Sequence, residues 1–498
     1  MTPFAAHTPG EPQADGARFP GCRCLRRAAP RWLSADGAPG YRPLVMDQAP
    51  FAGRTLHFIG IGGAGMSGLA LVARSLGARV TGSDQAESPV LAGLREAGIE
   101  AAAGHDAANL PAGAEVVIST AIPDDNPELS AARAAGAAVL HRADLLGELS
   151  RMKRTIAVSG AHGKTTTASM VAHALRGAGR DPAFLIGGEL RSAGTNAAWG
   201  TGEWAVIEAD ESDRSFLKLG RDVAVITNIE LDHHSTYASL AELEQAFEEF
   251  AEPAELLVLG PDVELPATGA AVRIEIEGEP PAGAADLRAE RVELLPGRSR
   301  FEVDGTPVEL PVPGRHNVLN ALAALAACRA AGVELADAAA ALADFSGAGR
   351  RFEEHGQTAG GALVYDDYAH HPTEVRATLE AARTLAEADG RRLIACFQPH
   401  LYSRTHALAG DFGRALALAD LVVVVDVYPA RERSEDFPGV SGLLVAESAA
   451  DAGGGRPVWW LPQLDDAVRM LAPELGARDL LVTLGAGDVD RVAKELTA

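Results

Sequence analysis

The stretch with the clearest capacity for chemistry is SGAHGKTTT, residues 159–167, which follows a short apolar run. Successive backbone N–H groups in a glycine-rich turn such as the one at Gly160 and Gly163 bind anions. Lys164 would supply positive charge to the outer phosphates of a nucleotide, and the hydroxyl of Thr165 would bind Mg²⁺. A standard loop of this kind has about four residues between its glycines, whereas only two stand here. The pattern therefore predicts a shortened phosphate-binding loop.

A second glycine-rich turn, GIGGAG at residues 60–65, follows the first predicted strand and opens a predicted helix. Glycines let the backbone approach a pyrophosphate, whose charge the helix N-terminus favours. Asp84 stands about twenty residues further on, where an acidic residue can hold a ribose. The motif predicts a diphosphate ligand without saying which nucleotide, so an NAD-dependent enzyme is an alternative.

Two further polar stretches follow predicted strands. EADESD at 208–213 offers the carboxylate of Glu208, and Mg²⁺ prefers oxygen ligands. DHH at 232–234 offers His233, which can act as a metal ligand, an orienting group or a base. Each stretch taken alone is equally consistent with a solvated surface loop, so the metal hypothesis depends on the other motifs.

The last third of the chain carries cationic side chains that stand out in so acidic a protein. They lie in GRRFE (349–353), YDDYAHHPTE (365–374) and QPHLYSRT (398–405). Arginine suits the planar recognition of carboxylates and phosphates. The set consists of Arg350, Arg351, His370, His371, His400 and Arg404. Earlier in the chain, Asn317 and Asn320 share one face of a predicted helix start, where they would read a base edge or cap the helix.

Five further stretches belong with these motifs: GSD (82–84), STAI (119–122), DNPE (125–128), NIELDHH (228–234) and GRHNVLNALAA (314–324). Taken together and in this order, the motifs resemble the Mur ligase family. The resemblance spans about residues 54–405. It implies a first domain that binds the UDP part of a substrate, a second that binds ATP and Mg²⁺, and a third that helps to bind an amino acid. The similarity is greatest to the alanine-adding branch. This implies ATP-dependent joining of L-alanine to the carboxylate of UDP-N-acetylmuramate through an acyl phosphate, in cytoplasmic peptidoglycan precursor synthesis.

The resemblance also assigns roles to individual residues. The catalytic residues it implies are Lys164, Glu208, His233 and Arg351, with Thr165, Glu208 and His233 at the metal. The ATP-binding residues it implies are Gly160, Ala161, His162, Gly163, Lys164, Thr165, Thr166, Asn317, Asn320, Arg351 and Asp367. The substrate-binding residues it implies are Gly62, Gly63, Gly65, Met66, Ser67, Ser83, Asp84, His105, Ser119, Thr120, Asn196, His370, His371, His400 and Arg404.

Two departures from the family refine these assignments. Several sister ligases carry a modified lysine downstream of the DH pair, whereas residues 241–250 contain none, which agrees with the alanine-adding branch. Leu401 stands where many relatives have arginine, so the substrate contact is assigned to Arg404. A ligase that attaches a recycled tripeptide to the same sugar nucleotide shares most motifs and remains an alternative. An NAD-dependent enzyme and a binding-only P-loop protein are the last alternatives, and an NAD enzyme would leave Lys164 and the C-terminal cluster without a role.

The elements that must position these motifs form a repeated strand–turn–helix pattern, typical of doubly wound parallel sheets. Nearly every motif follows a strand, and open α/β sheets bind ligands at the carboxyl ends of their strands. The predicted fold is a Rossmann-like domain at 51–150, a central P-loop ATPase-like domain at 151–347 and a Rossmann-like domain at 348–498. Residues 1–50 are predicted to be a disordered extension, and 270–312 a small β subregion. Strands are predicted at 114–120, 155–160, 204–210, 223–229, 255–260, 362–368, 392–397, 421–427 and 480–487.

Composition limits the classes of partner. The chain has 498 residues and a net charge of −24, which argues against nucleic acid or an anionic membrane surface. Four cysteines suit a reducing compartment, here the cytoplasm. Since no apolar run approaches the ~20 residues of a membrane span, no membrane insertion is expected. We expect small-molecule substrates and a monomer or weak homodimer.

Overall fold

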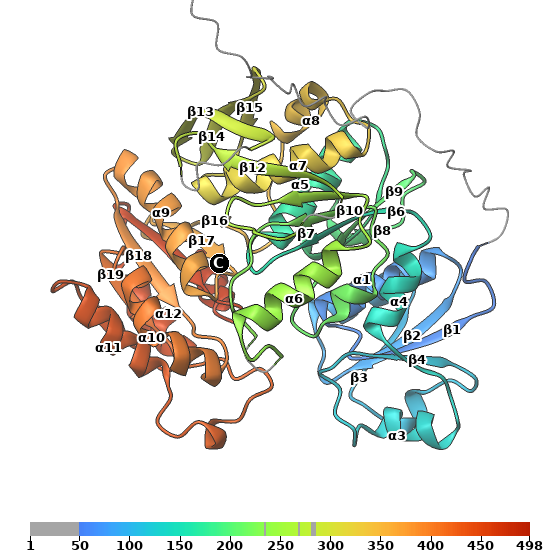
Figure 1. Cartoon of the computed structure of the whole chain (residues 1–498). Coiled ribbons are helices and arrows are strands. Elements are labelled where there is room, and N and C mark those ends of the chain that lie inside the picture. The colour runs from blue at the N-terminus through green and yellow to red at the C-terminus, as the bar shows by residue number, and fades with distance from the viewer. Residues whose placement is uncertain (1–48, 234–235, 267–268, 280–284) are drawn as a thin grey trace, which may run out of the picture. The chain divides into compact units, whose positions relative to one another are not determined.

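The structure is a computed structural model that describes residues 49–233, 236–266, 269–279 and 285–498. The extension predicted at 1–50 therefore lies almost entirely outside the described residues, as does His234 of the DHH stretch. Three α/β sheets follow one another along the described chain (Figure 1). This arrangement agrees with the predicted fold class, while the exact domain limits remain predictions.

The first sheet has five parallel strands in the order β3-β2-β1-β4-β5. The strand order reverses between β1 and β4, and ligands bind at such a switch point, beyond the carboxyl ends of the strands. The glycine-rich turn at 60–65 follows β1 directly, so it lies at that point. Its elements are β1 (Thr55–Ile59), α1 (Ala64–Ser75), β2 (Arg79–Asp84), α2 (Pro89–Glu96), β3 (Glu100–Ala103), β4 (Glu115–Ile118), α3 (Pro127–Ala134), β5 (Val139–His141) and α4 (Arg142–Ser150).

The second sheet has ten strands in the order β15-β14-β13-β12-β11-β10-β6-β9-β7-β8. Its centre is parallel, and β6 lies between β9 and β10. The predicted β subregion is confirmed, since β13, β14 and β15 form an antiparallel extension. The strands are β6 (Arg154–Ser159), β7 (Ala183–Leu190), β8 (Thr195–Ala198), β9 (Trp204–Glu208), β10 (Val223–Ile226), β11 (Leu256–Leu259), β12 (Ala270–Ile276), β13 (Leu287–Leu295), β14 (Arg298–Val303) and β15 (Thr306–Leu310).

Hydrophobic layers on both faces of this sheet hold the phosphate loop in place. The helices are α5 (Lys164–Gly177), α6 (Leu240–Ala251), α7 (Arg315–Ala330) and α8 (Leu335–Leu342). On one face, Val158 and Val225 pack with buried residues of α5, α7 and α8. On the other, Ala157 and Ile226 pack with α6 and with α1 of the first sheet. β6 is therefore covered on both faces, as its continuous apolar sequence predicts for a central parallel strand.

The third sheet has six strands in the order β16-β17-β21-β18-β19-β20, parallel except for the edge strand β16. The predicted strand at 421–427 is β19, all four residues of which are buried. The elements are β16 (Glu353–Gln357), β17 (Leu363–Asp367), α9 (Pro372–Ala388), β18 (Arg392–Phe397), α10 (Tyr402–Leu416), β19 (Leu421–Val424), α11 (Gly442–Ala452), β20 (Val458–Trp460), α12 (Leu464–Glu474), β21 (Asp479–Leu484) and α13 (Asp490–Thr497).

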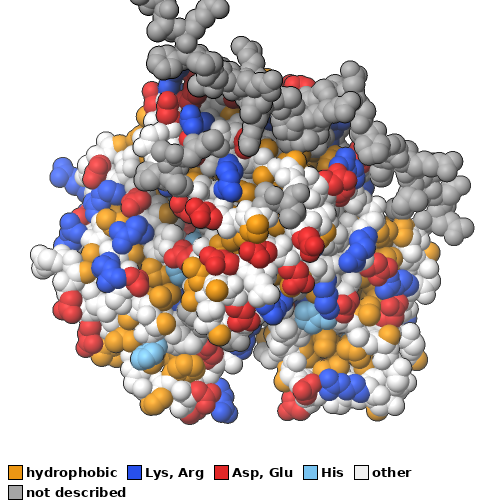
Figure 2. Space-filling model, viewed as in Figure 1, with side chains coloured by type: hydrophobic (Ala, Val, Ile, Leu, Met, Phe, Trp, Pro, Cys, Tyr) orange, Lys and Arg blue, Asp and Glu red, His pale blue; other side chains and the backbone are white. Residues whose placement is uncertain are grey.

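Among the described residues, no helix combines the length and apolar character needed to cross a membrane. The face shown in Figure 2 carries acidic and basic side chains interspersed with one another.

Candidate functional site

The predicted phosphate loop connects β6 to α5, and its two glycines have backbone conformations that favour glycine. Gly160 has φ +129° and Gly163 has φ +81°. A Cβ at Gly160 would lie 2.2 Å from Thr227 Oγ1, and one at Gly163 would lie 2.4 Å from Asn320 Oδ1. No side chain caps α5 at Gly163, so its first backbone N–H groups can receive an anion. The shortened loop therefore has the form of an anion-binding turn.

Lys164 folds back over this loop. Its Nζ donates to the carbonyl oxygens of Gly160 (2.7 Å) and Ala161 (3.2 Å) and to Glu211 Oε1 (3.1 Å). Burial alone would lower the pKa of Lys164, but the carboxylates of Glu211, Asp210 and Glu208 raise it. The side chain is thus a cation held at the loop. Glu211 is only 2% exposed.

The three predicted metal ligands fall into two neighbouring groups. Thr165 Oγ1 donates to Glu208 Oε1 at 3.0 Å, so these two lie together. His233 Nε2 lies 3.3 Å from Oε1 of Glu211, the partner of Lys164. Glu211 Oε2 is buried without a hydrogen-bond partner among the described residues. Mg²⁺ prefers oxygen ligands. The hydroxyl of Thr165 and the carboxylates of Glu208 and Glu211 are such ligands, so these residues fit the ion.

The C-terminal sheet contributes Arg351 to the phosphate loop. Arg351 Nη2 donates to Thr165 Oγ1 at 3.2 Å, and its guanidinium lies 5.2 Å from the centre of the Tyr368 ring. Asp367 Oδ2 accepts from the backbone N–H of Phe352, and its Oδ1 from that of Ala369. Burial raises the pKa of Asp367 to about 6. Asp367 therefore fixes the backbone beside Arg351, whose guanidinium contacts the loop at Thr165.

Arg404 forms a buried pair with Asp232, the residue before His233. Its Nε and Nη2 donate to the Asp232 carboxylate at 2.9–3.2 Å. Burial alone would raise the pKa of Asp232, but Arg404 lowers it well below its usual range. His400 Nδ1 lies 3.2 Å from Arg404 Nη1, and the rings of His400 and His370 lie 5.9 Å apart. Three of the predicted cationic residues are therefore neighbours.

The two histidines of this group are neutral at pH 7. Burial lowers the pKa of His370 to about 3 and that of His400 to about 4. Because a neutral imidazole both donates and accepts, the two rings can hydrogen-bond an uncharged part of a substrate. Arg404 is therefore the positive charge among these three side chains.

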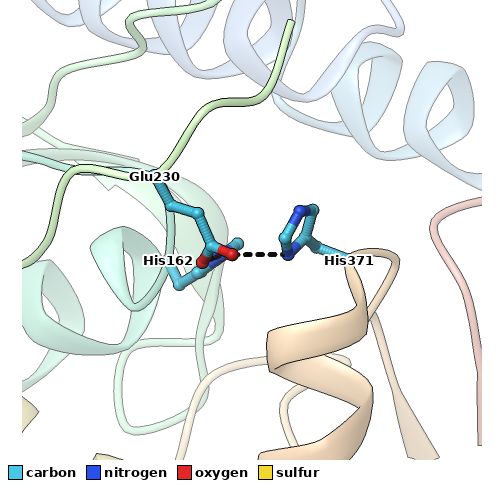
Figure 3. A group of neighbouring side chains, drawn as sticks. All are labelled: His162, Glu230 and His371. Carbon is cyan, nitrogen blue, oxygen red and sulfur yellow. Dashed lines mark hydrogen bonds and ion pairs between the residues drawn. The ribbon is translucent and has the colours of Figure 1, made fainter. Parts of the chain in front are cut away.

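His162, His371 and Glu230 form a separate cluster of side chains (Figure 3). The two imidazole rings are 4.7 Å apart. His162 Nε2 lies 2.8 Å from Glu230 Oε2, and its Nδ1 lies 3.3 Å from Glu374 Oε1. Burial alone would lower the pKa of His162, but Glu230 and Glu374 raise it to about 9.

Asn317 and Asn320 occupy buried positions beneath the phosphate loop. Asn317 Nδ2 donates to the carbonyl of Pro313, and Asn320 Nδ2 donates to Asn317 Oδ1. Thr167 Oγ1 donates to Asn320 Oδ1 at 3.2 Å. These side chains thus brace the loop from α7. The hypothesis that they read a base edge would require them to leave these partners.

In the first sheet, the predicted substrate residues form a second polar site. Gly62 N–H donates to Asp84 Oδ2 at 2.8 Å, so Asp84 holds the glycine-rich turn. A Cβ at Gly62 would lie 2.9 Å from that oxygen. Ser83 Oγ lies 2.8 Å from His105 Nδ1 and donates to Glu128 Oε2 at 2.6 Å. Since Ser83 Oγ has one proton and gives it to Glu128, His105 Nδ1 is the donor in its contact with Ser83.

The remaining predicted substrate residues lie around α1 and β4. Gly63 is the N-cap of α1, and no side chain caps the helix there. A Cβ at Gly68 of α1 would lie 3.4 Å from Asn196 Nδ2, so Asn196 of β8 lies against this helix. The side chains of Met66 and Ser67 are buried in α1, and Thr166 is buried in α5. Ser119 and Thr120 follow β4 in the turn before α3.

Sequence reasoning missed several residues that the structure places at these sites. Four of them lie inside the motifs but were not singled out: Glu211, Glu230, Asp232 and Glu374. The position of Glu374 was recognisable from the sequence, because it forms a capping box with His371 at the start of α9. Arg142 lies in none of the recognised sequence motifs. It lies beside Gly65, where an added Cβ would be 3.2 Å from its Nη1, and it pairs with Asp210 and Asp213.

Comparisons with known proteins agree with the motifs. Three family models match: "Mur ligase family, catalytic domain" at residues 55–154, "Mur ligase middle domain" at 158–328 and "Mur ligase, glutamate ligase domain" at 350–487. The chain is 46% identical to a UDP-N-acetylmuramate–L-alanine ligase of Clavibacter michiganensis, over 91% of this chain and 95% of that protein. It is also 46% identical to one from Acidithiobacillus ferrooxidans, over 89% and 97%.

Solved structures show the same likeness. A UDP-N-acetylmuramate-alanine ligase from Thermotoga maritima is 31% identical, with a TM-score of 0.77 over 89% of this chain and 98% of that chain. A murein peptide ligase from Psychrobacter arcticus is 27% identical, with a TM-score of 0.66 over 89% and 98%.

Proposed function

The chain belongs to the Mur ligase family, and we propose that it joins L-alanine to the carboxylate of UDP-N-acetylmuramate with conversion of ATP to ADP and phosphate. The observation that carries this proposal is the set of side chains around Thr165. Lys164 belongs to the phosphate loop, Arg351 reaches it from the segment before β16, and the carboxylates of Glu208 and Glu211 lie beside them. The two proposed substrates, UDP-N-acetylmuramate and L-alanine, are taken from the names of the relatives.

The chemistry requires activation, because a carboxylate is a poor electrophile toward an amine. A carboxylate oxygen of the sugar nucleotide attacks the γ-phosphorus of ATP, and ADP leaves. The deprotonated amine of L-alanine then attacks the acyl carbon, an amide bond forms, and phosphate leaves. Phosphoryl transfer of this kind depends mainly on positioning and on neutralising charge. Lys164 and Arg351 would supply fixed positive charge at the phosphates and the tetrahedral intermediate.

We propose Mg²⁺ as the metal, held by Thr165 and Glu208, with His233 acting directly or through water. When bound, the ion would neutralise charge on the phosphates. Thr165 and Glu208 are already hydrogen-bonded to each other, so the chain brings these two oxygen donors together. Glu211, whose Oε2 has no hydrogen-bond partner among the described residues, is a further candidate ligand.

The first sheet would bind the UDP portion through the turn at 60–65, with Ser83 and His105 beside it. His370, His400 and Arg404 would contact the sugar or amino-acid end. The Arg404 guanidinium suits a carboxylate, and the neutral imidazoles suit hydroxyl or amine groups. Because two of the proposed substrates, ATP and UDP-N-acetylmuramate, are nucleotides, we place the reaction in the cytoplasm. A monomer or weak homodimer remains the expected state in solution.

Oxygen-18 labelling tests the reaction. Both carboxylate oxygens of UDP-N-acetylmuramate are labelled, and the released phosphate is examined after reaction with L-alanine. One labelled oxygen is expected in phosphate, since the acyl phosphate breaks at its acyl carbon. Label in AMP, or unlabelled phosphate during productive ligation, would refute the acyl-phosphate mechanism. Parallel assays with L-alanine and with the tripeptide L-alanyl-γ-D-glutamyl-meso-diaminopimelate separate the proposed activity from that of the peptide-ligase relatives.

A further inference from the structure

Three potential metal ligands converge from three separate elements. His162 lies in the phosphate loop, Glu230 follows β10, and His371 is the N-cap of α9. Their candidate ligand atoms all lie within 4.8 Å of one another. Figure 3 shows the three side chains together, with the Glu230 carboxylate facing His371. None of the three belongs to the proposed Mg²⁺ set, although the family resemblance assigns His162 to ATP binding and His371 to substrate binding.

The spacing suits a tetrahedral ion. Zinc bonds of about 2.0–2.1 Å in tetrahedral geometry place ligand atoms about 3.3 Å apart. His162 Nε2 lies 2.8 Å from Glu230 Oε2, and His371 Nδ1 lies 3.8 Å from Glu230 Oε1. The two distances end on different oxygens of Glu230, and the candidate ligand atoms lie within 4.8 Å of one another, so side-chain rotations that close up to about 1.5 Å would accommodate the ion.

The chemical types select the class of metal. Two imidazoles and one carboxylate are a ligand set of zinc sites that keep a fourth position for water. Mg²⁺ prefers oxygen ligands and an octahedral shell, which this set does not provide. The Glu230 side chain is 41% exposed, so an ion can reach the group from solvent.

Neighbouring groups orient the ligands in the way that metal sites require. The other ring nitrogen of His162, Nδ1, lies 3.3 Å from Glu374 Oε1, and a metal-bound histidine typically donates this N–H to a carboxylate. Thr373 Oγ1 donates to Glu230 at 2.9 Å. His371 Nδ1 accepts a long hydrogen bond of 3.4 Å from Thr373 N–H, which this nitrogen would give up on binding the ion.

We propose that His162, Glu230 and His371 bind one transition-metal ion of the Zn²⁺ class, which ties the phosphate loop to the start of α9. The ion would be bound in addition to the Mg²⁺ of the reaction. Because two ligands come from the central sheet region and one from the C-terminal region, bound Zn²⁺ would stabilise the chain against unfolding.

The test measures Zn²⁺ binding by the full chain in excess Mg²⁺, using competition with a chromophoric chelator. All proteins carry Cys22→Ser and Cys24→Ser, which removes thiol ligands outside the described residues. We expect one tightly bound Zn²⁺ per chain. Glu230→Gln and His371→Gln should each weaken binding by more than about 100-fold, and Glu374→Gln by about 10–100-fold. His406→Gln, at an exposed position on α10, is the matched control and should bind normally.

Two further measurements keep the outcome decisive if a variant folds poorly. X-ray absorption of the zinc-loaded parent protein should show two imidazole nitrogens and carboxylate oxygen around the ion. Zn²⁺ should raise the unfolding temperature of the parent but not that of Glu230→Gln. Failure to retain Zn²⁺ in the presence of Mg²⁺, equal retention by Glu230→Gln, or a spectrum without imidazole would each overturn the proposal.

Discussion

The fully buried carboxylate of Glu128 organises the proposed nucleotide-sugar site, and its replacement should show this directly. Glu128 accepts hydrogen bonds from His57 Nε2 (2.9 Å), Ser83 Oγ (2.6 Å), Asn109 Nδ2 (2.8 Å) and the backbone N–H of Asp106 (3.0 Å). All of these groups act as donors toward the carboxylate. In Glu128→Gln an NH₂ group would replace one of the two accepting oxygens. Because this NH₂ group is itself a donor, some of the four buried donors would be left without an acceptor.

The magnitude follows from the pKa of this group. Burial alone would raise the pKa of Glu128, but the hydrogen bonds from His57, Ser83 and Asn109 lower it from 4.5 to about 2. That difference corresponds to about 3 kcal/mol of stability. Because the pKa is lowered in the folded chain, this contribution is present above pH 4.5 and is lost as the pH falls through about 2. Removal of one partner from a buried ionic network costs a similar amount, about 3–5 kcal/mol.

Amide hydrogen exchange in β1, β2 and β4 is the suitable assay, because a three-domain chain does not unfold in one step and exchange reports stability region by region. Glu128→Gln should lower the local free energy of opening by about 3 kcal/mol. Glu115→Gln, which breaks a partly exposed pair with Arg54, is the control and should cost less than about 1 kcal/mol. Equal protection in the two variants would refute the argument.

Glu128→Gln should also separate substrate binding from chemistry, since Ser83 and His105 lose their fixed orientation while the phosphate loop is untouched. We expect a raised KM for UDP-N-acetylmuramate with kcat largely retained. A fall in kcat alone, with KM unchanged, would place Glu128 in a role other than substrate positioning.

The remaining predictions concern the phosphate loop. Lys164→Ala should lower kcat by about 100-fold or more, because its charge acts on the departing phosphate; Lys218→Ala, in an exposed pair with Asp144, is the control and should not. Near-normal turnover of Lys164→Ala would contradict the proposed role. Glu208→Ala and His233→Ala should each raise the Mg²⁺ concentration needed for half-maximal activity. Unchanged Mg²⁺ curves in both would leave these side chains with structural roles only.

Much of the fold could be predicted because parallel strands buried on both faces are continuous apolar runs. β6, β9, β10 and β19 were recognised in this way. The shortened loop was recognisable because two glycines with positive φ must precede a helix whose first N–H groups lack a side-chain cap. These are local constraints, and local constraints are visible in a sequence without knowledge of its tertiary contacts.

The partners of the site residues could not be predicted in the same way, because they come from distant parts of the chain. Arg351 and Thr165 are 186 positions apart, and Arg404 and Asp232 are 172 apart. The side-chain amides of Asn317 and Asn320 were candidates for reading a base edge. In the structure, however, the amide of Asn317 donates to the carbonyl of Pro313. Only the packed structure shows which polar groups are already engaged.

The pair between Arg404 and Asp232 bears directly on how substrate would bind. The guanidinium that we assign to a substrate carboxylate is already held through Nε and Nη2 by a protein carboxylate. Breaking a buried pair without replacement is costly, because each charge is left uncompensated. A substrate carboxylate can therefore take over Arg404 only if Asp232 gains another cation. Asp232 immediately precedes His233, the proposed metal ligand, whose Nε2 lies 3.8 Å from Asp232 Oδ2; since an imidazole binds metal only when uncharged, the additional cation would be the proposed metal ion. Exchange of carboxylates at Arg404 would thus couple substrate binding to the proposed metal site.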